Sequence, residues 1–397
     1  MNKFENIIHR AKELQQKIVD YRQDFHQHPE LAFHEFDTAR KVELVLKSLG
    51  IETRMLVNDT GVCGYLKGLK PGKTIALRAD MDALPIQEEA DVPYKSQNAG
   101  VMHACGHDAH TAMLLGAATI LSEWRRELTG NVVFIFQPAE EIGEGAKKMI
   151  EEGVLQGVDG IFGLHVAYFL DVGTLGYRLG PLLAAGDFFE VTIKGKGAHG
   201  STPHLSKDPI MIAANVIAVL QTIVSREVDP LESAVVSICK IEGGKAYNVI
   251  PDSVTFGGAI RSHNPELREY LLKRLREILH GVVTAMQGDY EFNLMSKFPA
   301  TINDDEMTLF VAALAKEILG EDKVFQIKAR MGSEDFSYYL EKIPGTFVYL
   351  GIANRKKGII CPGHTSKFNI DEDVLFTGAA INACVALEYL LEKGRAS

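Results

Sequence analysis

Cysteine is scarce in this 397-residue sequence, which contains five cysteines scattered along its length. Secreted domains that rely on disulfides carry a denser, even-numbered set, so we expect no disulfide framework and a reducing, cytoplasmic environment. The first residues also lack the basic-then-apolar pattern of a signal peptide, and no run of about 18 apolar residues predicts a membrane-spanning helix. We therefore expect no membrane partner.

Basic residues are in deficit, and the formal net charge is -10 at pH 7. A surface that binds nucleic acid needs a basic excess, so this charge argues against nucleic acid as a partner. The composition, 46 % hydrophobic and 24 % charged, is that of a globular protein. A chain of this length is longer than those that usually fold around a single hydrophobic core, so we expect two domains.

The regular elements that we predict alternate between strands and helices. Buried strands are expected at Thr74–Asp80, Val132–Phe136 and Gly160–Val166, with a long helix from Asp108 to about Leu128. Acidic and imidazole side chains stand at or just after the ends of these strands. This order predicts an α/β sheet whose functional site lies at the carboxyl-terminal edge of its strands.

Residues 187–296 change this rhythm to βαββαβ, the ferredoxin-like order. The expected elements are Phe188–Lys194, Asp208–Arg226, Ala234–Ile241, Ser253–Ser262, Glu266–Gln287 and Tyr290–Met295. This segment holds no cluster of metal-ligand type, yet a candidate ligand, His364, follows it in the chain. We therefore predict an inserted lid or dimerisation domain, which divides the catalytic domain into residues 1–186 and 297–397.

The densest group of chemically active side chains is His103–His110, with one thiol, three imidazoles and a carboxylate. A divalent metal is the usual reason for crowding such groups together. Cys105 and His107 are two residues apart, so both can face one metal from a short turn, and a thiolate can bridge two ions. An isolated C-x-H pair is more often a buried cysteine beside an ordinary histidine. Here Gly106 and ligand candidates elsewhere favour the metal.

Those further candidates come from three other places in the sequence. Glu140 and Glu141 follow a buried strand and a proline, and adjacent side chains of an extended chain diverge. One carboxylate can therefore bind metal while the other acts as a base, although such a pair is commonly a solvated turn. His165 ends a predicted apolar strand, and His364 follows the rigid Pro362-Gly363. Each histidine alone is more often structural, but together the set suffices for two metal ions.

Asp80 and Asp82 stand at the end of the strand Thr74–Asp80. Asp82 is a candidate to orient a ligand imidazole by accepting a hydrogen bond from it. A helix or turn cap is an equally simple interpretation of this residue.

The ordered motifs resemble the M20 family of metallopeptidases and amidohydrolases, in the branch of N-acyl-amino-acid amidohydrolases, hippurate hydrolases and plant auxin-conjugate hydrolases. The likeness covers essentially the whole chain. It is carried by RADMDALP (Arg78–Pro85), HACGHDAH (His103–His110), QPAEE (Gln137–Glu141), GLHV (Gly163–Val166), GKGAHGSTPH (Gly195–His204), NVIPD (Asn248–Asp252), GSEDFSYY (Gly332–Tyr339) and GHTSKF (Gly363–Phe368). The family's fold, a metal-binding α/β domain with an inserted ferredoxin-like domain, agrees with the organisation predicted above.

The resemblance implies a set of metal ligands for two divalent ions per subunit: Cys105, His107, Glu141, His165 and His364. A thiolate, imidazoles and a carboxylate suit zinc, manganese, cobalt or nickel. Relatives outside this branch have a histidine in place of Asp80 and an aspartate in place of Cys105, which leaves Asp80 outside the expected ligand set.

The implied reaction is hydrolysis of the amide bond of an N-acyl-L-amino acid, with Glu140 as general base. A metal lowers the pKa of water from about 15.7 towards about 7, and general acid–base help contributes roughly 10²–10⁴ in rate. His199 matches the family histidine that stabilises the oxyanion, and Asn248 and Arg261 match positions that grip the substrate. A guanidinium such as that of Arg261 suits a substrate carboxylate.

Three other functions remain open at this point. The nearest is a metallo-carboxypeptidase or dipeptidase that acts on short peptides. A thiol amidase with Cys105 as nucleophile would leave the other ligands without a role. A metal-binding interaction protein is the third, although structural zinc sites are usually closed by four ligands, whereas Glu140 is left over for chemistry. By the resemblance we also expect a homodimer or higher homo-oligomer, in which His199 completes the partner's active site.

Overall fold

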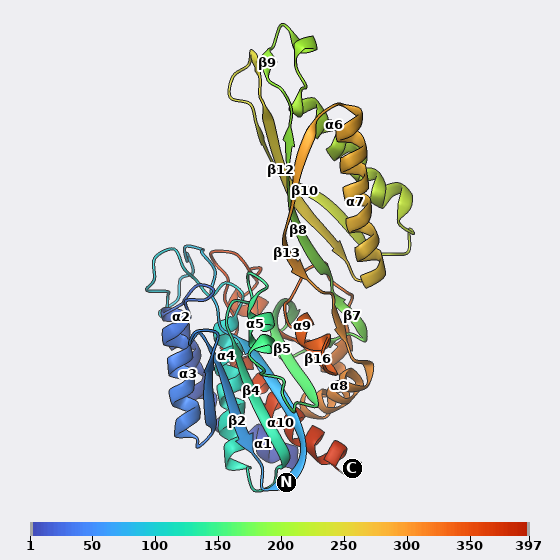
Figure 1. Cartoon of the computed structure of the whole chain (residues 1–397). Coiled ribbons are helices and arrows are strands. Elements are labelled where there is room, and N and C mark those ends of the chain that lie inside the picture. The colour runs from blue at the N-terminus through green and yellow to red at the C-terminus, as the bar shows by residue number, and fades with distance from the viewer. Residues whose placement is uncertain (1–2, 395–397) are drawn as a thin grey trace. The chain divides into compact units, whose positions relative to one another are not determined.

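The computed structural model describes residues 3–394 and divides the chain into two compact units (Figure 1). Unit 1 runs to Gly180, takes up Ile302–Lys328 and resumes at Asp335, whereas unit 2 comprises Pro181–Thr301 and Ala329–Glu334. The short strands β7 (Gly180–Leu183) and β14 (Thr301–Asn303) lie where the chain crosses. The α/β fold class and the inserted ferredoxin-like domain predicted from the sequence are confirmed.

Unit 1 is built on a mixed eight-stranded sheet in the order β1-β2-β4-β3-β5-β16-β6-β15. Its strands are β1 (Glu52–Leu56), β2 (Gly61–Lys67), β3 (Lys70–Asp80), β4 (Thr129–Gln137), β5 (Gly160–Asp171), β6 (Leu175–Tyr177), β15 (Val324–Gln326) and β16 (Gly345–Ala353). The four central strands, β4, β3, β5 and β16, are parallel to one another. Apolar runs such as Val132–Phe136 suit this place, since a central parallel strand is buried on both faces.

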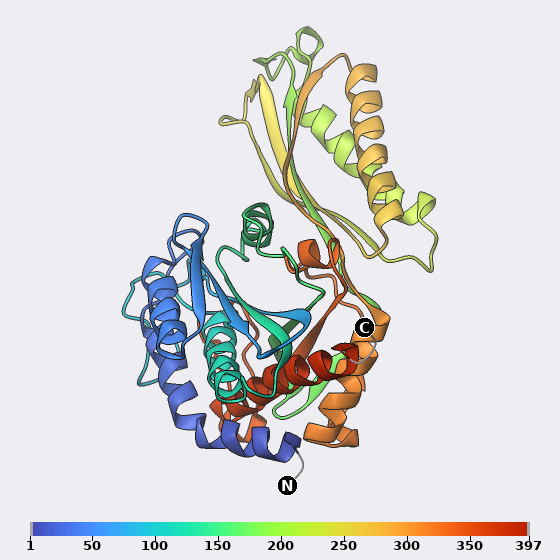
Figure 2. The same ribbon diagram turned by 60° about the horizontal axis from the view of Figure 1, so that its bottom comes forward.

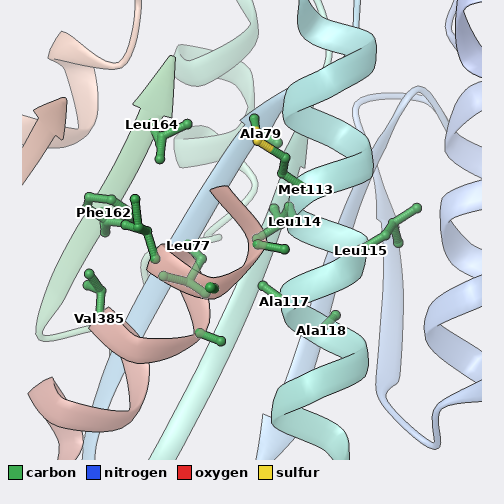
Figure 3. Close-up of a cluster of buried hydrophobic side chains, with 14 of the residues drawn as sticks. Leu77, Ala79, Met113, Leu114, Leu115, Ala117, Ala118, Phe162, Leu164 and Val385 are labelled. Atoms are coloured by element: carbon green, nitrogen blue, oxygen red, sulfur yellow. The ribbon is translucent and has the colours of Figure 1, made fainter. Parts of the chain in front are cut away.

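Helices cover this sheet (Figure 2). They are α1 (Lys3–Glu13), α2 (Gln15–Gln27), α3 (Phe36–Ser48), α4 (His107–Glu123), α5 (Gly145–Glu151), α8 (Asp305–Leu319), α9 (Ser337–Leu340) and α10 (Leu375–Gly394), with 3-10 turns at Glu321–Lys323, Arg355–Lys357 and Glu372–Val374. Helix α4 is buried all round from His107 to Leu121, because α2 and α10 pack against it beside the sheet. Figure 3 shows Met113 and Leu114 of α4 in the core with Leu77 of β3 and Phe162 of β5.

Two predicted boundaries in unit 1 are wrong. The helix expected to reach Leu128 ends at Glu123, and Arg125 then donates a hydrogen bond to the carbonyl of Lys67, which directs the chain towards β4. Strand β5 continues past Val166 to Asp171 because β16 pairs with it along this length. His165 therefore lies within a strand, and not at its end.

Unit 2 contains a four-stranded antiparallel sheet in the order β10-β12-β8-β13, with two long helices. In chain order the elements are β8 (Ala185–Lys194), α6 (Pro209–Thr222, followed by a π turn at Ile223–Glu227), β10 (Ala234–Gly243), β12 (Ser253–Ser262), α7 (Pro265–Ala285) and β13 (Asp289–Phe298). Both helices begin with an Asp or Asn cap followed by proline, a common helix start. The strand β9 (Ala198–His199) and a 3-10 turn at Pro203–Leu205 follow β8, and β11 (Val249–Ile250), which lies between β10 and β12, pairs with β9 in a small ribbon.

Two helical segments in the described part of the chain are long and apolar enough to cross a membrane by length and composition alone, Pro209–Glu227 and Glu372–Leu391. A core helix passes the same test, and 83 % of the second window is buried inside unit 1. Only 33 % of the first is buried, because one face of α6 packs on the sheet while Ile210, Met211 and Val219 are exposed.

Candidate metal centre

Cys105 and His107 are presented by the turn that begins α4. Gly106 between them has a φ of +93°, and a Cβ at this position would lie 2.4 Å from Cγ2 of Val166. Only glycine meets both demands without strain, so this residue allows the thiol and the imidazole to project from adjacent points of one tight turn.

The side chains of Cys105, His107 and His165 form a first group whose ligand atoms all lie within 4.8 Å of one another. Sγ of Cys105 is 3.5 Å from Nε2 of His165. Nδ1 of His165 lies 2.7 Å from the carbonyl oxygen of Val166, which can only accept, so Nδ1 carries the proton. Nε2 is therefore left with its lone pair towards the thiol, as metal ligation requires.

A second group, also within 4.8 Å, joins Cys105 to Glu141 and His364. Nε2 of His364 is 3.5 Å from a carboxylate oxygen of Glu141. Because Cys105 belongs to both groups, its sulfur is a candidate to bind both ions when they are present. The structure thus brings together all five side chains that the sequence analysis proposed as ligands.

Glu140 joins His107 and Glu141 in a third such group. The preceding residue, Ala139, has a φ of +55°, and its N–H donates to Oε1 of Glu35 at 2.8 Å. Left-handed backbone at a residue other than glycine costs energy and clusters at functional sites. His364 shows the same feature with a φ of +60°, so strained turns aim two of the site's side chains.

Asp82 links two of the proposed ligands. Its Oδ1 lies 3.2 Å from Nδ1 of His107, and its Oδ2 accepts a hydrogen bond from the backbone N–H of Glu141 at 3.0 Å. The carboxylate is buried, so it orients the imidazole and the Glu141 backbone together.

Asp80 is also buried beside His107, with Oδ2 at 3.7 Å from Nε2 of that ring. Its oxygens are already held, at 2.6 Å from Nη1 of Arg78 and at 2.5 Å from Nδ1 of His110. Burial alone would raise the pKa of Asp80, but the charges of Arg78, His107 and His110 hold it well below its usual range. Asp80 also forms a group with His107 and His110 whose ligand atoms lie within 4.8 Å of one another, so its place outside the ligand set stays a prediction.

The electrostatics of the site suit a cation. Burial and the nearby carboxylate of Glu141 raise the pKa of the Cys105 thiol well above its ordinary value, and burial raises the pKa of Glu141 to about 7. Seven buried side-chain atoms of the described residues have no hydrogen-bond partner, and two of them, Nε2 of His107 and Oε1 of Glu141, belong to proposed ligands. Unpaired buried lone pairs are costly, and a divalent ion would satisfy them and favour the thiolate. The donor set therefore fits the metal ions that the sequence implies.

Several supporting residues were missed by sequence reasoning. Buried Arg78 binds Asp80, the side chain of Gln137 and Asp335. The backbone N–H of Asp335 donates to Oε1 of Glu140 at 3.4 Å. These residues lie inside the motifs quoted for the resemblance, but nothing in one sequence indicates that Arg78 and Asp335 meet.

A second buried network supports the start of α4. Asp108 accepts from Nε of Arg22 at 2.8 Å and lies 2.7 Å from Nδ1 of His26, whose other nitrogen is 3.1 Å from Glu88. Since Asp108 follows His107 directly, this network fixes the first turn of the helix that carries a proposed ligand.

Three of the proposed site residues, His199, Asn248 and Arg261, belong to unit 2. Nδ1 of His199 accepts the backbone N–H of Ser201 at 3.1 Å and lies 2.7 Å from its hydroxyl. A backbone N–H can only donate, so the neutral ring carries its proton on Nε2. The adjacent Gly200 N–H donates to the carbonyl of Asn248 at 2.8 Å, so the loops of His199 and Asn248 are joined.

Arg261 lies on β12 and is partly committed within unit 2. Its Nη1 donates to the carbonyl of Met331 at 2.7 Å and to Oγ of Ser333 at 3.2 Å, and its guanidinium lies 5.6 Å from the ring centre of Phe188. A role in substrate binding stays a prediction.

Residues 76–388 match the sequence pattern of the family described as peptidase family M20/M25/M40. The chain is 44% identical over 379 residues to IAA-amino acid hydrolase ILR1-like 4 of Arabidopsis thaliana, covering 94% of this chain and 86% of that protein. It is 41% identical over 393 residues to thermostable carboxypeptidase 2 of Saccharolobus solfataricus, covering 98% and 99%. N-acetylcysteine deacetylase of Bacillus subtilis is 42% identical over 360 residues, covering 90% and 93%.

Solved structures agree with these matches. A putative aminohydrolase from methicillin resistant Staphylococcus aureus superposes with a TM-score of 0.92 at 40% identity, covering 98% of this chain and 100% of that one. The Bacillus subtilis YXEP protein, described as a dinuclear metal binding peptidase from the M20 family, gives a TM-score of 0.83 at 37% identity and covers 96% and 99%.

Proposed function

The chain belongs to peptidase family M20/M25/M40, and we propose that it hydrolyses the amide bond of N-acyl-L-amino acids. The proposal draws on its relatives, which include an IAA-amino acid hydrolase and an N-acetylcysteine deacetylase. The observation that carries the proposal is the pair of ligand groups that share Cys105, with Glu140 in a third group beside them. Two divalent ions, from among zinc, manganese, cobalt and nickel, suit this donor set.

In the proposed reaction the ions, when bound, would polarise the amide carbonyl and make water acidic enough to attack at neutral pH. Glu140 takes the proton of the attacking water and passes it to the departing nitrogen. The Nε2–H of His199 donates to the oxygen on which negative charge develops. Asp82 keeps the ring of His107 and the backbone of Glu141 in place throughout.

The substrate class rests on the relatives' names. Two of them refer to N-acyl amino acids, as an IAA-amino acid hydrolase and an N-acetylcysteine deacetylase. In our proposal Arg261 pairs with the free carboxylate of the amino acid. Arg261→Ala should then raise KM for acid substrates and do little for their carboxamide analogues, whereas equal losses on both would assign Arg261 a structural role only.

A carboxypeptidase is the second candidate, because the chain is 41% identical to a thermostable carboxypeptidase over almost the full length of both. A thiol amidase is disfavoured. Burial raises the pKa of Cys105, so without a cation the thiol would seldom ionise. A screen of metal-reconstituted protein against N-acyl amino acids and short peptides separates the two candidates. Turnover of peptides alone would contradict the N-acyl assignment.

We further propose a homodimer through unit 2, in which His199 acts at the partner's metal site. The exposed apolar face of α6, with Ile210 43% and Met211 52% exposed, supports such a contact. Mixed dimers of a Glu140→Ala chain and a His199→Ala chain test this idea. If His199 acts in trans, each mixed dimer contains one intact site and activity returns, whereas action in cis leaves every mixed dimer inactive.

A further inference from the structure

A cavity of about 480 Å³ lies in unit 1 at the amino-terminal ends of the central strands, whereas the candidate metal centre lies towards their carboxyl-terminal ends. The cavity is bordered by these amino-terminal ends, at Lys73, Asp159 and Pro344, and by α1, α8 and α10. These three helices gather at the lower edge of unit 1 in Figure 2. The five steps from Gly160 to His165 along β5 span about 16 Å, so the cavity is separate from the proposed ligands.

The inner wall of this cavity is apolar and aromatic. It includes Phe4 of α1, Met307, Phe310 and Leu314 of α8, and Tyr389 of α10. The rings of Phe310 and Tyr389 meet edge to face with centres 6.4 Å apart. A wall of this kind favours an apolar body, and aromatic faces also attract cations.

The charged groups around the cavity are unbalanced. Five carboxylates line it, those of Asp159, Asp304, Glu306, Glu317 and Glu388, against the single ammonium of Lys73. Within residues 3–394, Asp159, Glu317 and Glu388 form no ion pair, although Asp159 accepts a backbone hydrogen bond from Thr74 at 2.8 Å and the charge of Lys3 interacts with that of Glu388. The local field therefore favours a cation over a neutral molecule or an anion.

Tyr389 adds a polar group that the fold leaves unused. The residue is only 6% exposed and lines the cavity, and its hydroxyl forms no hydrogen bond to any described residue. Burial, with the charges of Asp159 and Glu306, raises its pKa to about 12, so the group stays a neutral phenol. The hydroxyl is therefore available to hydrogen-bond a molecule that enters the cavity.

We propose that this cavity binds a small organic ammonium ion with an aromatic or branched apolar body. The apolar part lies against Phe310 and Leu314, the ammonium faces the carboxylates, and an N–H of the ligand donates to the hydroxyl of Tyr389. The site is independent of the hydrolytic reaction, since none of its residues belongs to the metal centre.

The test is a titration of the metal-loaded protein with phenethylammonium, followed by calorimetry. The neutral 2-phenylethanol and the anionic 3-phenylpropanoate are probes of similar shape. Saturable binding of the cation is expected, with affinity for the alcohol at least about tenfold lower, and the acid should not displace the bound cation. Equal affinity for all three probes, or no saturable binding of the cation, would overturn the proposal.

Two substitutions locate the site. Glu317→Gln should weaken phenethylammonium binding roughly two- to fivefold, as for a partly exposed ion pair. Tyr389→Phe, which removes only the hydroxyl, should weaken it roughly two- to tenfold. Glu269→Gln on the exposed surface of α7 is the matched control and should change nothing. Unchanged affinity in Glu317→Gln and in folded Tyr389→Phe would place the amine elsewhere and refute the assignment.

Discussion

Asp82→Asn should weaken metal binding while leaving the fold intact. The two oxygens of Asp82 face two donors, Nδ1 of His107 at 3.2 Å and the backbone N–H of Glu141 at 3.0 Å. Nδ1 has to carry a proton whenever Nε2 of His107 ligates a metal, and the backbone N–H always does. An asparagine offers one oxygen and one NH₂, so one of the two donors would face another donor.

The size of the effect follows from this mismatch. A buried polar group left without its partner costs about 1–3 kcal/mol. Each 1.4 kcal/mol corresponds to about a tenfold change in affinity, and residues that orient metal ligands are typically worth about 10–100-fold. We therefore expect a loss of metal affinity of about 10–100-fold in Asp82→Asn.

Competition with a chromophoric chelator measures this loss directly. Asp91→Asn is the matched control, because Asp91 is an exposed carboxylate outside the cluster. Circular dichroism checks that both variants are folded. Metal affinity equal to that of the parent protein would refute the orienting role of Asp82.

Four more predictions concern single groups. Glu140→Gln should lower turnover by about 10²–10⁴ while metal content is retained, and loss of metal would mean that the roles of the two glutamates are misassigned. Cys105→Ser should weaken binding of both ions, since a hydroxyl is a far poorer anion than a thiolate, and two ions held with parental affinity would exclude the bridge. Nitrogen NMR of neutral His199 should show the proton on Nε2, because the backbone of Ser201 donates to Nδ1, and the opposite tautomer would contradict the proposed oxyanion contact. Burial and the charge of Asp82 raise the pKa of Glu35 from 4.5 to about 8, so between these pH values the folded metal-free protein binds a proton that the unfolded chain has released. Its unfolding free energy should therefore fall as pH rises from 4.5 to 8, and Glu35→Gln should flatten this dependence. An unchanged pH profile in Glu35→Gln would contradict the prediction.

The sequence allowed the candidate metal centre to be proposed because the proposed ligands stand in short motifs near the starts and ends of regular elements. Cys105 and His107 share one turn, and Glu140 and Glu141 follow one strand, so local order alone places them. The sequence predicted correctly that His165 belongs to a strand, but it set the end of that strand too early. The length of β5 depends on its pairing with β16, which the sequence does not reveal.

Contacts between distant segments could not be predicted in this way. Arg78 and Asp335 are 257 residues apart, and only the folded sheet brings them together. Ala329–Glu334 packs with unit 2 although the chain on either side of it belongs to unit 1. Glu35 accepts a hydrogen bond from the backbone N–H of Ala139, and no pattern of side chains in the sequence predicts this contact.

The central claim is that a Cys105-centred site binds two ions and that these ions support amide hydrolysis. The most direct measurement titrates metal into chelator-treated protein and records bound ions per chain and hydrolysis of N-acyl amino acids in the same samples. We predict that activity is lost on chelation, rises with added metal and reaches its plateau at two ions per chain. Full activity in metal-free protein, or a plateau of binding and activity at a single ion, would contradict the account.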